Sequence, residues 1–231
     1  GVGLPAGVKA RVERVPGAKA DQADERYAVE RFILRTDDPA HAVPILLLRP
    51  RGKAPAESVV IGLAQDGKAG FLKHRAETIA ELLKRNVAVC LPDLRGAGET
   101  ASDGRGRTSG ATSYSASLLL HGRTVPGEQL RELVLVMNAL PGLGFASITL
   151  WGDSFASPND STGDLAAPLD AAKLPRQSEP MGGTLALLGG TFGGKHVKAV
   201  YVRGGLVNFR SMLDSPFCFF PHDAVLPDAL P

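Results

Sequence analysis

The chain has 231 residues, of which 44% are apolar and 22% charged, enough for one sizeable hydrophobic core and too few for two ordinary domains. Its formal charge of +2 is spread over scattered Lys and Arg residues, so the sequence has no basic block for nucleic acid or an anionic membrane. No apolar run approaches the roughly 20 residues that span a bilayer, and we expect a small-molecule partner.

The N-terminal part of the chain contains an unpatterned segment and then two strands. Residues 1–26 show no sustained hydrophobic period, and we predict an N-terminal arm there, with the core domain over 27–231. Residues 27–36 alternate like a half-buried strand, and 43–49 form a second strand that stops at Pro50. This pair predicts an antiparallel entry hairpin.

The rest of the chain alternates between buried strands and helices. Four short, almost wholly apolar runs are typical of strands covered on both faces: residues 58–64, 87–91, 148–151 and 197–202. After each of the first three runs the apolar residues recur at helical spacing, which predicts helices over residues 72–83, 126–140 and 181–192. Residues 96–114, rich in Gly, Ser and Thr, predict a long surface loop. The pattern predicts an α/β domain with a mostly parallel sheet and helices on both faces.

The strongest candidate for chemistry follows the strand that ends at Trp151. The run Gly152-Asp153-Ser154-Phe155-Ala156 matches the nucleophile-elbow pattern G-x-S-x-G, with Ala156 in the last small position. Small residues on either side of the serine permit a tight turn that projects the hydroxyl into a cleft, where a histidine can take its proton. The alternative is an ordinary polar turn after a strand.

Two further strand ends meet the same edge of the predicted sheet. Backbone amides of the run Gln65-Asp66-Gly67-Lys68, together with that of Phe155, would face a developing alkoxide, although a plain loop is the alternative. The second strand end carries Asp93-Leu94-Arg95-Gly96-Ala97-Gly98. We interpret Asp93 and Arg95 as structural residues whose charges tie this loop to the sheet.

Taken together, these residues resemble the α/β-hydrolase superfamily and, within it, the acetyl xylan esterase-like and dienelactone hydrolase-like branch. The resemblance runs from about Tyr27 to Arg210, and its most specific parts are the elbow and the run from Asp93 to Gly98. It implies hydrolysis of carboxylic esters, including acetyl esters of carbohydrates, through an acyl-enzyme on Ser154. Amides of Gln65 or Asp66 and of Phe155 would then hold the oxyanion.

The acid and the base of a catalytic triad have no obvious place in the sequence. The superfamily places them after a seventh and an eighth strand, and the sequence ends soon after the sixth predicted strand. His222 is the remaining candidate for the base, and the other histidines lack a catalytic position: His41, His74, His121 and His196. A natural chain that continues further would explain the gap, and so would a non-catalytic binding or scaffolding domain.

Motifs for cofactors are absent from the sequence. Cys90 and Cys218 lie far apart without metal-ligand spacing, and we predict two buried thiols instead of a disulfide bridge. Residues 189–195 have the spacing of a phosphate loop, but His196 stands where such a loop needs Ser or Thr. No G-x-G-x-x-G run follows the first parallel strand. We therefore predict that the protein uses neither a metal nor another cofactor.

Overall fold

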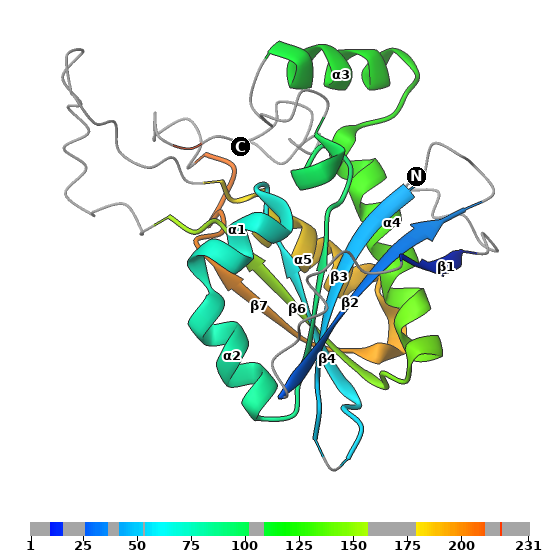
Figure 1. Ribbon diagram of the computed structural model, residues 1–231. Coiled ribbons are helices and arrows are strands. Elements are labelled where there is room, and N and C mark those ends of the chain that lie inside the picture. The colour runs from blue at the N-terminus through cyan, green and yellow to red at the C-terminus, as the bar shows by residue number, and fades with distance from the viewer. Residues whose placement is uncertain are drawn as a thin grey trace, which may run out of the picture.

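The computed structural model describes residues 10–15, 26–36, 42–52, 54–101, 109–156 and 179–210, and Cys218. Within these ranges seven strands form one sheet in the order β1-β2-β3-β5-β4-β6-β7 (Figure 1). No helix in these ranges combines the length and the apolar character needed to cross a bilayer.

The sheet has an antiparallel part and a parallel part. On the antiparallel side lie β1 (Arg11–Arg14), β2 (Tyr27–Arg35) and β3 (Ala42–Pro50). The other four strands pair in parallel, and they are β5 (Ala88–Pro92), β4 (Ser58–Leu63), β6 (Ser147–Asp153) and β7 (Val197–Arg203). Because β3 runs antiparallel to both β2 and β5, only β1 and β3 oppose the common direction. The predicted mostly parallel sheet with an antiparallel entry hairpin is confirmed.

Helices cover the sheet on both faces (Figure 1). Phe71 of α1 (Gly67–His74) and Ile79 of α2 (Ala76–Lys84) pack on one face, in a cluster that includes Leu46 and Leu48. The neighbouring residues Ile45 and Leu47 point to the other face and pack with α4 (Val125–Ala139) and α5 (Met181–Phe192). The alternation along β3 thus divides the apolar residues into two cores, one for each helical layer.

Two elements were not predicted by the sequence pattern. β1 lies within the expected N-terminal arm, and its register with β2 is supported by cross-strand ion pairs, Arg14 with Glu30 and Arg35 with Glu13. A polar edge strand of this kind has no hydrophobic period to reveal it. Helix α3 (Ser109–Leu120) begins inside the expected loop 96–114, and it follows a short 3-10 helix, η2 (Gly98–Thr100).

The helix predicted over residues 72–83 is in fact a pair of helices. It divides into α1 and α2 at Arg75, whose φ of −132° and ψ of 19° lie outside the helical region. The guanidinium of Arg75 turns inward and forms two hydrogen bonds with Asp153 at the end of β6. This contact between distant segments gives a physical reason for the break. The remaining connections contain η3 (Leu140–Leu143) and η4 (Gly194–His196).

Candidate active site

A sharp turn follows β6 at the carboxyl ends of the parallel strands. Ser154 continues the pairing with β7, because its N–H donates to the Arg203 carbonyl at 3.2 Å. The chain then turns at Phe155, whose φ of 57° is in the left-handed region that side chains rarely adopt. The Phe155 ring packs edge-on against Phe71 with centroids 5.1 Å apart. The left-handed backbone angle in this run is thus at Phe155, one residue after the serine, and a nucleophile elbow at Ser154 stays a prediction.

Glycines allow three distant segments to approach this turn. A Cβ atom on Gly152 would lie 2.4 Å from the Gly182 carbonyl oxygen, and one on Gly182 would lie 2.2 Å from that of Leu63. Such distances exclude any side chain at these positions without a backbone shift. The end of β4, the end of β6 and the first turn of α5 therefore meet at one point. In the sequence, 22 residues outside the described ranges, 157–178, separate the turn from Glu179 just before that helix.

The Ser154 side chain is enclosed in this arrangement. Ser154 is 5% exposed, and its Oγ accepts a hydrogen bond from the Ala156 N–H at 3.4 Å. A Cβ atom on Gly204, which follows β7, would lie 2.2 Å from this oxygen. The hydroxyl therefore lies on the β7 side of β6, whereas the loop containing Gln65 follows β4 on the opposite side. Among the described residues the hydroxyl is enclosed and does not face the Gln65 loop, so its projection into a cleft stays a prediction.

The predicted oxyanion donors occupy different positions around the turn. The Phe155 N–H donates to Asp153 Oδ1 at 2.7 Å, so this amide is already bound to a carboxylate. The Gln65 side chain accepts from the Met181 N–H at 3.2 Å, which links the loop to the first turn of α5. Asp66 is exposed in the tight turn that Gly67 closes by donating to the Ala64 carbonyl at 3.0 Å. The structure brings the Gln65 loop next to α5 and leaves the Ser154 hydroxyl on the other side of β6.

Asp93 and Arg95 hold the neighbouring loops in place. The buried Asp93 carboxylate accepts from the Lys68 Nζ at 2.6 Å and from the backbone amides of Lys68 and Glu99 at 2.8 and 3.0 Å. Arg95 binds the buried Glu132 of α4, with 3.1 Å between Nε and Oε1. These contacts connect the loop after β5 to α1 and α4. The structural role predicted for Asp93 and Arg95 is confirmed.

Sequence reasoning missed the ion pair between Asp153 and Arg75. The Asp153 side chain is fully buried, and its two oxygens accept from Arg75 Nε and Nη2 at 2.7 and 2.9 Å. A bidentate pair of this kind fixes the orientation of both groups. The residues are 78 positions apart, and Asp153 occupies a variable position of the elbow pattern. No local signal in the sequence links them.

Comparisons with known proteins bear on the fold alone. No known family profile matches the chain, and no curated protein is similar to it in sequence. The structure is similar to a Bacteroides fragilis protein assigned as an acetyl xylan esterase, with a TM-score of 0.49, 16% identity and coverage of 65% of this chain and 43% of the other. For a bacterial heroin esterase the TM-score is 0.48 and the identity 14%, with coverage of 83% of this chain and 48% of the other. For acetyl xylan esterase 1 from a Thermoanaerobacterium species the TM-score is 0.47 and the identity 10%, with coverage of 84% of this chain and 52% of the other.

The chain has an α/β-hydrolase fold. The strand order of the mostly parallel sheet, with β5 placed between β3 and β4, agrees at the level of fold with the resemblance seen in the sequence. The chain spans about half of the length of these three proteins or less.

A serine nucleophile in this α/β-hydrolase fold needs a base, and the described residues do not place one beside Ser154. No histidine or carboxylate within the described ranges forms a hydrogen bond with its hydroxyl. His74 lies near the turn and contacts the Phe155 ring at 5.4 Å, while His196 lies 3.4 Å from the Ala146 carbonyl. His222 and His41 lie outside the described residues. The described ranges also contain no cluster of three side chains suited to a metal ion.

Proposed function

We propose that the protein is a serine hydrolase that cleaves carboxylic esters, including acetyl esters of carbohydrates, through an acyl-enzyme on Ser154. The observation that supports this most directly is the convergence of the turn after β6, the Gln65 loop and the first turn of α5. Ligands of open parallel sheets bind beyond the carboxyl ends of the strands, where this convergence lies. The positive end of a helix dipole near the same point favours a developing negative charge.

The proposed reaction requires a rearrangement of the turn. The Ser154 oxygen would attack the ester carbonyl carbon, lose its proton to a base and release the alcohol, and water would then hydrolyse the acyl-enzyme. The hydroxyl must first move out of its contact with Gly204, and the Phe155 amide must leave Asp153 to act as an oxyanion donor. Amides of Gln65 or Asp66 are the other proposed donors, and His222 is the candidate base.

Covalent labelling tests the nucleophile. The protein and its Ser154→Ala variant are treated with a fluorophosphonate probe and assayed with 4-nitrophenyl acetate. We expect Ser154→Ala to abolish labelling and to lower kcat/KM by at least about 1,000-fold, the scale of losing a catalytic nucleophile. Ser147→Ala, at the start of β6, is the matched control and should leave both unchanged. Equal labelling of the protein and Ser154→Ala would rule out this serine.

The alternative is a non-catalytic α/β-hydrolase-like domain that binds a ligand or scaffolds a partner. Two observations favour it: the enclosed hydroxyl of Ser154, and the lack of a base beside it among the described residues. In this case the folded protein would not react with the probe, and Ser154→Ala would match it in every assay. If the protein reacts, His222→Gln then tests the proposed base by its effect on kcat at constant fold.

A further inference from the structure

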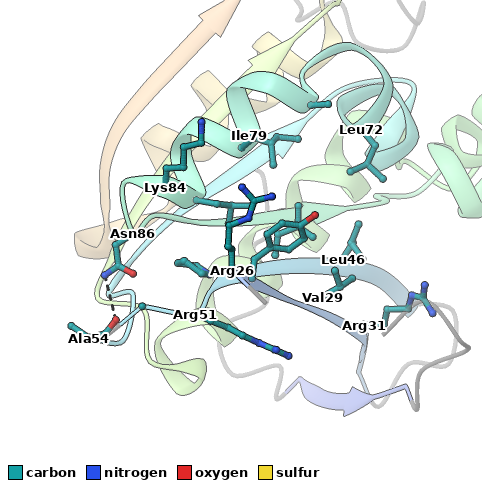
Figure 2. A pocket seen from close by; sticks show the side chains of 17 residues that line it. Arg26, Val29, Arg31, Leu46, Arg51, Ala54, Leu72, Ile79, Lys84 and Asn86 are labelled. Carbon is teal, nitrogen blue, oxygen red and sulfur yellow. Dashed lines mark hydrogen bonds between the residues drawn. The ribbon is translucent and has the colours of Figure 1, made fainter. Parts of the chain in front are cut away.

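A second site lies between α2 and the antiparallel part of the sheet. Here a groove of about 930 Å³ separates α2 from the face of β2 and β3 (Figure 2). Neither the turn after β6 nor the Gln65 loop lines it. Its volume is in the range of small-molecule sites in proteins.

The floor of the groove is apolar because of how the strands alternate. Val29 of β2 and Leu46 of β3 lie on one side of the groove and Ile79 of α2 on the other (Figure 2), and Leu48 and Leu83 also line it. Leu72 at the end of the groove is 43% exposed. The other floor residues are themselves largely buried, so the floor is a recessed apolar lining, which favours an apolar ligand over water.

The rim of the groove is cationic. Among the residues that the structure describes, the lining contains no Asp or Glu and has four basic residues: Arg26, Arg31, Arg51 and Lys84. The side chains of Arg31 and Arg51 form no ion pair with a described residue, whereas Lys84 is paired with Glu81 outside the lining. Figure 2 shows the Arg26 guanidinium reaching from the strand side toward α2. An apolar floor below a one-sided positive rim is complementary to a molecule with an alkyl chain and an anionic head.

We propose that this groove binds one monomer of an anionic amphiphile, a long-chain aliphatic carboxylate or sulfate. The alkyl chain lies along Val29, Leu46, Leu48 and Ile79, and the positive charge of the rim holds the anionic head group at the mouth of the groove. This site is separate from the proposed hydrolase site, and binding does not depend on Ser154.

Calorimetric titration with single-chain probes below their micellar concentrations tests the ligand class. We expect saturable binding of dodecanoate with one site per chain, weaker binding of dodecanol, and none of dodecyltrimethylammonium. Decanoate should bind roughly 15-fold more weakly than dodecanoate, because it lacks two methylenes and each buried methylene changes affinity by roughly fourfold. Equal affinity for the anion and the alcohol, or binding to phosphatidylglycerol vesicles without saturable monomer binding, would overturn the proposal.

Two variants and a matched control locate the site. The double change Arg31→Gln and Arg51→Gln should weaken dodecanoate at least tenfold and leave dodecanol unchanged. Ala80→Trp, which fills the groove from an exposed position of α2, should abolish binding of both. Arg35→Gln removes one charge from the same strand outside the lining and should bind normally. Unchanged affinity in Ala80→Trp, with the thermal melt of each variant showing an intact fold, would place the ligand elsewhere and reject the groove.

Discussion

The Asp153 carboxylate accepts three hydrogen bonds, two from Arg75 and one from the Phe155 amide. The Arg75 side chain is 12% exposed and Asp153 is fully buried, so water screens the pair little. Asp153→Asn would leave the guanidinium without its counter-charge in this place. We expect the free energy of unfolding to fall by about 3–5 kcal/mol, the usual cost of an unpaired buried charge. Urea denaturation followed by far-UV circular dichroism measures it.

A double-mutant cycle separates the pairing from the burial. Arg75→Gln combined with Asp153→Asn removes both charges, and its stability should exceed that predicted by adding the two single losses. If the losses of the single variants simply add, the two side chains do not stabilise each other, and the break between α1 and α2 needs another cause.

At the residue level the sequence could locate the turn and could not orient its side chains. The spacing of Gly152, Ser154 and Ala156 after an apolar strand predicted a turn in the run where the structure has the left-handed residue Phe155. The direction of the hydroxyl depends on which residue takes the left-handed angle, and in the structure that residue is Phe155. The partner of Asp153 is equally hidden, because a contact over 78 positions leaves no trace in local periodicity.

At the level of elements, α5 depends on a contact made by a loop far from it in sequence. The Gln65 Oε1 accepts from the Met181 N–H, one of the amides that a helix leaves without an intrahelical partner. We expect Gln65→Ala to lower the free energy of unfolding by about 1 kcal/mol, the usual contribution of such a bond. Gln65→Glu keeps an acceptor oxygen and adds a charge that the helix dipole favours, so it should be at least as stable as the original protein.

Thermal unfolding of both Gln65 variants measures this effect. Equal loss of stability in Gln65→Ala and Gln65→Glu would show that the amide side chain contributes through packing instead of its hydrogen bond. If the proposed hydrolase activity is established, its kcat in the two variants also reports whether the position of α5 affects the site.

Elements with strong hydrophobic periods were predictable, and those without them were not. The five strands from β2 to β6 were found because each buries apolar residues, as in the wholly buried β5. The apolar run also located β7, but the expectation that this strand is covered on both faces was wrong, because most of its residues are exposed at the end of the sheet. Three of the four residues of β1 are charged, and two of them form ion pairs with β2. The first half of α3 is rich in Gly, Ser and Thr. Neither pattern differs from that of a loop. The division at Arg75 arises from tertiary contact, which overrides the local helical spacing.

For the whole molecule, Cys90 reports on the integrity of the sheet and of the core that packs under α4 and α5. It lies in β5 at the centre of the sheet, and it is fully buried without a disulfide. Burial raises the pKa of the Cys90 thiol to about 12 from its ordinary value of 9.0. The thiol is therefore protonated and inaccessible in the folded protein at pH 8. Reaction requires global unfolding, since β5 pairs with a neighbouring strand on each side.

Two measurements test the burial of Cys90: the reactivity of its thiol and the pH dependence of the free energy of unfolding. In a Cys218→Ser background, Ellman's reagent at pH 8 should react with Cys90 only at the rate expected from global unfolding, and rapidly in urea.

The unfolded thiol ionises above pH 9 while the folded thiol stays protonated, so stability is lost as the pH rises from 9 toward 12. The slope is about 1.4 kcal/mol per pH unit. Cys90→Ala lacks this contribution, and comparing its urea unfolding at pH 8 and pH 10 isolates the effect. Fast reaction in native conditions, or the same pH dependence in Cys90→Ala, would mean that the centre of the sheet opens locally.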